Sequence, residues 1–383
     1  MIVREFQVVG FRNIALAKAE FAPGLNLLHG ANGQGKTNLL EALHMLVTGR
    51  SFRTVDEKET LPWAREPGGR TLVRARVETR LGEDRFMLGY DGAGKRIAVN
   101  GEPVRRLGDL VGRLNAVLFT PHDLNLVRGG PGGRRRFLDL ALSQVSRTYF
   151  HHLQCYDQAL RQRNALLKQA ARRPSARTEM EAWNPALAEH GGALHAARAD
   201  AVARLDGLAR VAYANIAGEG AEALSLAYRP HPQAVRGVEP SASEVSDTAA
   251  DASGRIAAAL VASAADDLRH GATQAGPHRD DMAFLLDNRD ARAFASQGQQ
   301  RSCVLALKMA ELRFMTDTVG ESPVLMLDDL MSELDQRRRA ALLAALGPVS
   351  QVFVTATDRG AVTDLARPTA SFAVRGGELA ADG

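Results

Sequence analysis

A segment near the start of the 383-residue chain has the residue types and the spacing of a phosphate-binding loop. Gly30-Ala31-Asn32-Gly33-Gln34-Gly35-Lys36-Thr37 matches the pattern G-x-x-x-x-G-K-[ST]. Glycines let backbone N–H groups wrap around an anion, and the N-terminus of a following helix adds its dipole. A lysine in this place binds the β- and γ-phosphates, and the threonine hydroxyl binds Mg²⁺. An apolar strand pattern precedes the segment and a helical pattern follows it, so we predict a binding site for a nucleoside triphosphate.

The composition makes Lys36 informative and leaves the arginines ambiguous. The chain has 48 lysine and arginine residues against 44 acidic ones, and only six of the 48 are lysine. A compositional bias toward arginine explains this as well as nucleic-acid binding does. A net charge of +4 therefore permits a polyanionic partner without requiring one. In a chain so poor in lysine, a chance match to the phosphate-loop pattern is rare.

A second candidate lies where an apolar strand pattern ends in two carboxylates. Val324–Leu327 is followed by Asp328 and Asp329. Alone this is a weak signal, because many buried strands end in aspartate. Beside a phosphate-binding loop, we expect Asp328 to hold Mg²⁺ together with Thr37, and Asp329 to orient or deprotonate the attacking water. Lys36, Asp328 and Asp329 are therefore the predicted catalytic residues.

Two polar strings each permit a structural and a functional interpretation. Ser296-Gln297-Gly298-Gln299 precedes a helical pattern, so Ser296 suits a helix cap, but its place between a helical region and the carboxylate strand favours a function as well. Ser332-Glu333-Leu334-Asp335 follows the carboxylates. Its last residue suits the cap of a helix over Gln336–Leu346, and the same string can also form a loop that crosses to a second subunit.

The periodicity of apolar residues divides the chain into three segments. Residues 1–146 alternate strand and helix patterns, residues 147–270 change to a helical period, and residues 271–383 return to the alternation. Residues 231–253 are polar, acidic and without a period, which indicates a flexible surface loop. We therefore predict an α/β domain that is split by a helical arm and whose two halves meet in space.

The cysteines and the apolar runs indicate the compartment. Cys155 and Cys303 lie far apart, without the spacing of a metal site or a disulfide framework, as is typical of a reducing cytosol. The N-terminal residues carry charges where a signal peptide needs an apolar stretch. The longest run of small apolar residues, 256–265, is far shorter than the ~20 residues that a membrane helix needs. We expect a cytoplasmic protein that does not enter a membrane.

Taken in chain order, these motifs resemble those of an ATP-binding-cassette (ABC) ATPase head, which is a P-loop NTPase. Residues 30–37 resemble the Walker A loop, Ser296–Gln299 the signature loop, Asp328 and Asp329 the Walker B motif, and Ser332–Asp335 the D-loop. In that class the signature loop binds the γ-phosphate of ATP held by the other subunit. ATP thus joins two heads face to face, and hydrolysis releases them. The resemblance adds Ser296, Gly298 and Gln299 to the residues expected to bind ATP.

Four further strings narrow the resemblance to the RecF family of bacterial DNA-repair proteins. They are Gly10–Asn13, Gly129–Asp139, Gly276–Asp281 and Phe294–Arg301. The resemblance covers nearly the whole chain and mainly spares residues 231–253. It implies a clamp that uses ATP and Mg²⁺, dimerises on ATP and binds single-stranded, gapped or double-stranded DNA. It also implies action with RecO and RecR to help load recombinase in recombinational repair, replication restart and SOS induction.

Two positions depart from the transporters of the ABC class. Asp329 stands where they have a glutamate, and Thr357 stands at the expected position of their switch histidine. Both departures fit slow hydrolysis that acts as a timer, and the resemblance implies a weak DNA-dependent ATPase.

The run Arg134-Arg135-Arg136 is the candidate DNA contact. Cations in front of the predicted helix 137–142 oppose its dipole, and a bound anion would reverse that penalty. A solvated charge run in an arginine-rich chain explains the same residues as well. Aromatic residues make up only 5% of the chain, which argues against base stacking and for salt-sensitive contacts to phosphates.

Three other classes of protein share parts of this pattern. The nucleotide-binding subunit of an ABC transporter is the main alternative, but it needs a coupling groove for a membrane partner and has no long helical arm in mid-chain. A scaffold with a vestigial site would not need Lys36, Thr37 and Asp328 to be intact. A nuclease-fused repair ATPase needs a further carboxylate-rich domain, for which the chain has no room.

Overall fold

The described residues of the computed structural model form two compact units. The model describes residues 1–54, 56–63, 69–91, 93–170, 173, 175–218, 220–231, 248–346, 349–363 and 367–382, with the backbone alone for 332, 333, 345, 346, 361 and 363. Unit 1 comprises Met1–Asp123 and Leu305–Gly383, and unit 2 comprises Leu124–Val304. Residues 124–146 and 271–304 therefore group with the helical segment in the structure. The predicted three-part division at residues 146 and 270 stays a prediction.

An antiparallel sheet forms one part of unit 1. In the described chain its strand order is β2-β1-β4-β5-β6-β7. Along β4 the side chains alternate between buried and more exposed, as in a sheet that has one face on a core. The strands are β1 (Ile2–Phe11), β2 (Ile14–Glu20), β4 (Thr71–Thr79), β5 (Gly82–Tyr90), β6 (Lys95–Val99) and β7 (Glu102–Pro103).

A second, mostly parallel sheet joins the two halves of unit 1. Its described strands run in the order β15-β14-β3-β13-β12-β8. All residues of β12 and β13 are buried, as is typical of parallel strands covered on both faces. Because β13 pairs with β3 and β12 pairs with β8, the two halves of the α/β domain meet as predicted. The strands are β3 (Gly24–His29), β8 (Ala116–Phe119), β12 (Val324–Leu327), β13 (Gln351–Ala356), β14 (Ala370–Arg375) and β15 (Glu378–Ala381).

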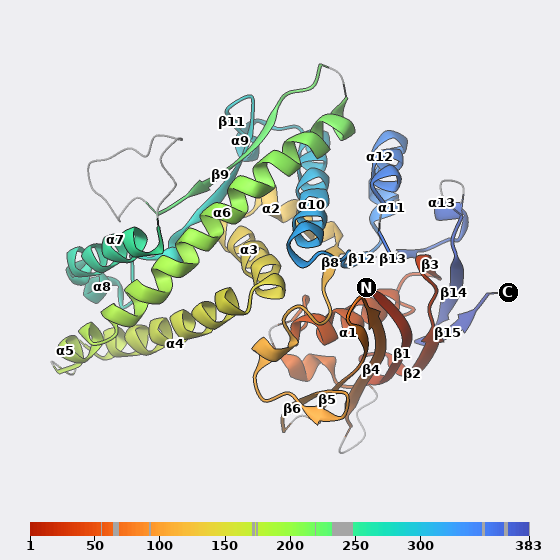
Figure 1. Ribbon diagram of the computed structural model, residues 1–383, viewed down its shortest axis with the longest axis horizontal. Helices are drawn as coiled ribbons and strands as arrows, with labels where there is room; N and C mark the ends of the chain where they lie inside the picture. Colours follow the sequence, from red (N-terminus) through yellow and green to blue (C-terminus); the bar gives the residue numbers. More distant parts are fainter. Residues whose placement is uncertain are drawn as a thin grey trace. The chain divides into compact units, whose positions relative to one another are not determined.

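Helix α1 (Lys36–Thr48) lies in the core of unit 1. Its buried leucines belong to one cluster with residues of both sheets, such as Val8 in β1 and Phe353 in β13. Figure 1 shows α1 beside β1 and β4, and it packs against both. The helix that follows the phosphate-binding loop is therefore held from two sides. Shorter elements complete this unit: η1 (Glu57–Thr60), η2 (Leu107–Leu110), η3 (Pro121–Leu124), α11 (Leu330–Glu333), α12 (Gln336–Leu346) and α13 (Gly360–Thr363).

The long helix α6 (Asn184–Ala217) organises unit 2. It packs against α4 (Arg147–Gln169), α7 (Ala249–Ala262) and β9 (Leu224–Arg229), and it is the long green helix in Figure 1. Gly192 permits a close approach of α7, because a Cβ there would lie 2.5 Å from the carbonyl oxygen of Ala249. The other elements are α2 (Asn125–Arg128), α3 (Pro131–Val145), α5 (Ser175–Glu181), α8 (Ala264–His270), η5 (Pro277–Arg279), β10 (Asp281–Leu286), β11 (Arg289–Asp290) and α9 (Ala291–Phe294). Helix α10 (Gln297–Val319) begins in this unit and ends in unit 1.

Two predictions about secondary structure need correction. Of the predicted loop 231–253, residues 232–247 lie outside the described residues, but α7 already begins at Ala249. Thr248 and Asp251 form a capping box there, which the compositional argument overlooked. The helix predicted over 137–142 is α3, which begins earlier, at Pro131. A proline is common in the first turn of a helix, because the N–H that it lacks would have no hydrogen-bond partner within the helix.

Histidine 278 lies in a polar cluster inside unit 2. Its Nδ1 lies 2.6 Å from the hydroxyl of Tyr156, and its Nε2 lies 3.0 Å from the carbonyl oxygen of Thr273. This arrangement suits a neutral ring that donates from Nε2 and accepts at Nδ1. Burial is the main cause that lowers the pKa of His278 to about 4. The folded state therefore resists a proton that the unfolded chain takes up near pH 6.5.

We predict that acid weakens the fold through His278. Between about pH 6.5 and pH 4 the unfolded state binds a proton that the folded state does not, so the free energy of unfolding falls by up to about 3 kcal/mol as the pH decreases. His278→Gln removes this titration and should flatten the fall, as measured by urea unfolding at pH 7 and pH 5. His270→Gln, at an exposed position of α8, is the control that should keep the wild-type slope. Equal slopes for both variants would contradict the prediction.

Candidate nucleotide-binding site

The phosphate-binding loop connects β3 to α1 in unit 1. Gly30, Gly33 and Gly35 have φ values of 154°, 78° and 113°, a region that other residues rarely adopt. Gly35 is the N-cap of α1, so the first N–H groups of this helix face the loop. Nζ of Lys36 donates to the carbonyl oxygens of Gly30 and Ala31, at 2.7 and 3.1 Å. The ammonium group thus lies over the loop, as binding to phosphate requires.

Asp328 lies directly after β12 and is only 6% exposed. Its Oδ1 accepts hydrogen bonds from the hydroxyls of Thr37 and Thr355, both at 2.9 Å. Burial is the main cause that raises the pKa of Asp328, and the two threonines act in the opposite direction. The structure therefore brings together Thr37 and Asp328, whose oxygen atoms are hard donors of the kind that Mg²⁺ prefers.

Asp329 has a left-handed backbone conformation, with φ of 49°. Such a conformation is uncommon for a residue with a side chain, and it is found mostly where the surroundings impose it. Here the N–H of Asp329 donates to the hydroxyl of Thr355 at 2.8 Å. Thr355 of β13 thus contacts both predicted catalytic residues, Asp328 through its carboxylate and Asp329 through its backbone N–H. Sequence reasoning missed Thr355, whose signal is a hydroxyl that directly follows the apolar run Val352–Val354.

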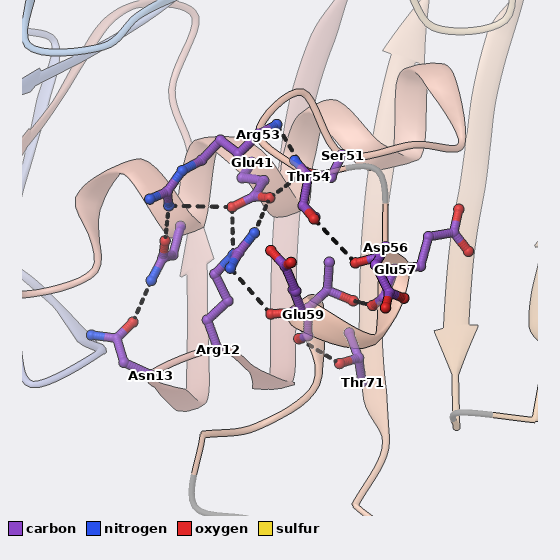
Figure 2. Close-up of polar contacts among 12 residues, drawn as sticks. Arg12, Asn13, Glu41, Ser51, Arg53, Thr54, Asp56, Glu57, Glu59 and Thr71 are labelled. Carbon is purple, nitrogen blue, oxygen red and sulfur yellow. Dashed lines mark hydrogen bonds and ion pairs between the residues drawn. The ribbon is translucent and has the colours of Figure 1, made fainter.

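A buried polar network supports the loop from its other side (Figure 2). Glu41 of α1 is fully buried and accepts two hydrogen bonds from the guanidinium group of Arg12, at 2.7 and 2.8 Å. Asn38, one turn before Glu41, donates to Oδ1 of Asn13 at 2.7 Å. Nδ2 of Asn13 in turn lies 3.3 Å from the carbonyl oxygen of Gly33 in the loop. Arg12 and Asn13 belong to a string that carried the family resemblance, but no role was assigned to them.

The predicted signature loop lies at the start of α10. Ser296 caps this helix, and Gln297–Gln299 belong to its first turn. The N–H of Ser296 donates to Oε1 of Gln299 at 2.7 Å, and the N–H of Gln299 donates to Oγ of Ser296 at 3.3 Å. This reciprocal pair is a capping box. Gly298 lies between the two residues, in the first turn of α10. The structure thus bears out the cap, and binding of the γ-phosphate by Ser296, Gly298 and Gln299 stays a prediction.

The predicted helix after the D-loop is α12, with the predicted bounds. Oδ1 of Asp335 accepts from the N–H of Arg338 at 2.9 Å, which is the expected cap and the largest cause that lowers the pKa of Asp335. The crossing of this segment to a second subunit stays a prediction. Thr357, at the expected switch position, is exposed just after β13.

The candidate DNA contact Arg134–Arg136 needs correction. Arg134 is only 4% exposed and donates to both carboxylate oxygens of Asp281, at 2.7 and 2.8 Å. Nη1 of Arg135 donates to the carbonyl oxygen of Asp280 at 2.7 Å. Both guanidinium groups thus hold α3 against the start of β10, and Arg134 is not a free surface cation. Arg136 is exposed and stays a prediction.

The site combines a phosphate-binding loop after β3 with a carboxylate at the end of β12, a parallel strand two places away in the same sheet. Together with the antiparallel sheet, these features define an ABC-type ATPase head. The family model described as "RecF/RecN/SMC N terminal domain" matches residues 2–379. The chain is 44% identical over 363 residues to the DNA replication and repair protein RecF of Symbiobacterium thermophilum, covering 94% of this chain and 92% of that protein. It is 39% identical over 385 residues to the RecF of Lactobacillus delbrueckii subsp. bulgaricus, covering 99% and 97%. The chain belongs to the RecF family.

Solved structures agree with this assignment. A structure of the recombination mediator protein RecF-ATPrS in the RecFOR pathway matches with a TM-score of 0.88 and 33% identity, covering 100% of this chain and 98% of that one. An Smc head bound to the C-winged helix domain of ScpA matches with a TM-score of 0.54 and 12% identity, which shows a shared fold alone. In the described part of the chain, no helix is both long and apolar enough to cross a membrane.

We predict that breaking the buried pair of Arg12 and Glu41 strongly destabilises unit 1. Glu41→Gln leaves the Arg12 guanidinium without its counter-charge and should lower the free energy of unfolding by about 3–5 kcal/mol, measured by urea unfolding. Glu78→Gln is the matched control, because Glu78 pairs with Arg4 at 2.7 Å on the surface. That change should cost less than about 1 kcal/mol. Similar losses in both variants would show that burial of the pair is not what matters.

Proposed function

We propose that this chain is an ATP-dependent DNA clamp of the RecF type that acts in recombinational DNA repair, replication restart and SOS induction. The observation that carries the proposal is the hydrogen bond from Thr37 to Asp328, which joins the phosphate-binding helix to the carboxylate strand across 291 positions. Membership of the RecF family supports the repair role, since its relatives are named DNA replication and repair protein RecF. The relatives do not favour the transporter subunit considered as the alternative.

Binding of ATP rests on the loop and on the first turn of α1. The N–H groups of residues 30–37 and the helix dipole attract the phosphates, and Lys36 adds a compact positive charge. Similar structures of RecF-ATP and RecF-ATPrS support ATP as the nucleotide. Thr37 and Asp328 would hold Mg²⁺, which neutralises charge on the phosphates. The two side chains already lie within hydrogen-bond distance of each other, so they fit one shared cation.

Hydrolysis depends on Asp329, which orients or deprotonates the attacking water. Its side chain is one methylene shorter than the glutamate of ABC transporters, and Thr357 replaces their switch histidine. Both differences favour slow turnover. In this proposal the chain is a weak, DNA-dependent ATPase in which hydrolysis times the release of the clamp.

Dimerisation depends on the predicted signature loop, Ser296–Gln299, at the start of α10. Helix N-termini attract anions. In the proposed dimer this loop contacts the γ-phosphate held by the second copy, so ATP joins the two heads. The clamp then binds single-stranded, gapped or double-stranded DNA through its phosphates, with Arg136 as a candidate contact. RecR and RecO are the proposed partners, and the cytoplasm is the proposed location.

The central experiment measures self-association and binding to gapped DNA in the presence of ATP, ADP or no nucleotide. Analytical ultracentrifugation should show dimers with ATP only, and DNA affinity should rise at least ten-fold with ATP over ADP. Lys36→Met should abolish both effects, because the loop loses the ammonium group that binds the phosphates of ATP. A wild-type protein whose association and DNA affinity do not respond to ATP would sink the proposal.

A second prediction separates the cap of α10 from phosphate binding. Ser296→Asp keeps a good N-cap but adds a negative charge, so the fold should stay stable while ATP-driven dimerisation weakens at least ten-fold. Ser146→Asp is the matched control, because Ser146 caps α4 by accepting from the N–H of Tyr149. That variant should dimerise like the wild type. If both variants dimerise normally, Ser296 only caps the helix.

A further inference from the structure

The hairpin of β14 and β15 in unit 1 contacts the phosphate-binding loop through its turn. Arg375 and Glu378 are paired, so Gly376 and Gly377 form a two-residue turn, with φ values of 56° and 84°. Two residues with positive φ are the mark of a type I′ hairpin turn. The N–H of Gly377 donates to the carbonyl oxygen of Gln34 at 2.8 Å, and the N–H of Gly376 donates to Oε1 of Gln34 at 2.6 Å. Both backbone N–H groups of the turn thus donate hydrogen bonds to Gln34 of the loop.

The same hairpin meets the beginning of the loop. Strand β14 runs parallel to β3, where Ala373 lies opposite His29, the residue before the loop. A Cβ at Gly30 would lie 2.3 Å from the carbonyl oxygen of Val374 in β14. Asp382, just after β15, contacts the ring of His29. The hairpin therefore contacts the loop at its first residue, Gly30, and in its middle, at Gln34.

The two glycines of the turn differ in their surroundings. A Cβ at Gly377 would lie 2.5 Å from the carbonyl oxygen of Asn13 and 2.9 Å from Cα of Ile14, whereas a Cβ at Gly376 would meet nothing within 4 Å. Backbone atoms cannot move aside as a flexible side chain can. A side chain at position 377 must therefore displace the turn relative to Asn13 and Ile14, while one at position 376 points into open space.

We infer that the Gly376–Gly377 turn is a positioning element of the nucleotide site: it holds the phosphate-binding loop, through Gln34, in the conformation that receives phosphate. This inference rests on the proposed ATP site. A loop that is held in place before binding loses less conformational freedom when the ligand arrives, so holding it raises affinity. Loss of the turn should then weaken nucleotide binding without changing any residue that contacts phosphate.

The test compares Gly377→Asn with Gly376→Asn in the full chain. Asparagine tolerates positive φ, so both variants have a similar backbone requirement, and only the first collides with Asn13. Equilibrium binding of a fluorescent ATP analogue should show a dissociation constant at least ten-fold higher for Gly377→Asn and within two-fold of wild type for Gly376→Asn. Hydrogen exchange should become faster over residues 30–37 in Gly377→Asn alone and stay unchanged over β4 in both.

The outcomes distinguish this inference from the proposed function. If the folded wild type binds no ATP, the proposed function fails, and exchange over residues 30–37 still tests the turn. If Gly377→Asn binds ATP and exchanges like Gly376→Asn, the inference is wrong. If Gly377→Asn does not fold, Gln34→Ala, which removes the side-chain acceptor of the Gly376 N–H, should still speed exchange over residues 30–37 and weaken binding several-fold. Unchanged exchange and affinity in that variant would overturn the inference too.

Discussion

One carboxylate oxygen, Oδ1 of Asp328, joins three segments that lie far apart in the sequence. It accepts from Thr37 at the start of α1 and from Thr355 in β13, and Thr355 also accepts from the N–H of Asp329. This meeting is possible because β3, β13 and β12 are neighbours that run in parallel, so their carboxyl ends lie along one edge of the sheet. The order of these strands therefore determines whether the residues for ATP and Mg²⁺ lie together. Helix α1 packs on the parallel sheet, and the antiparallel sheet packs against α1 and holds it in place.

Around this edge the chain uses buried charges where side chains must have one position. Glu41 and Arg12 are both almost fully buried. Arg53 links Glu41 to Asn38, which leads through Asn13 to the loop. A buried ion pair is weak evidence for stability, since apolar residues of similar volume often stabilise a fold as well. Apolar residues have no directional bonds, however, and could not hold two asparagines in register with a backbone carbonyl. We interpret the network as a source of geometry more than of stability.

The parts of the site that could be predicted from the sequence are those in which neighbouring residues carry the information. The loop over residues 30–37 is such a case, because its glycines, lysine and threonine are contiguous and lie between a strand and a helix. The apolar run before Asp328 is another, and the helix over Gln336–Leu346 was predicted with its bounds. Contacts between distant segments left no such signal. Arg134 looks like a free cation in the sequence, and only the fold shows that Asp281 neutralises it. The Gly-Gly turn after β14 could have been recognised as a hairpin, but its contact with Gln34 could not.

The distance along the chain between Thr37 and Asp328 has a consequence for the protein during its synthesis. The phosphate-binding loop leaves the ribosome 291 residues before its carboxylate partner does. At 5–20 residues per second this delay lasts roughly 15 to 60 s. Until then β3 lacks its partner β13, and β8 lacks its partner β12. The unpaired backbone edges of these two apolar strands therefore need protection from other chains. A nascent chain therefore has a nucleotide-binding sequence long before it has a nucleotide-binding site, and unit 2 emerges whole in the interval between the two.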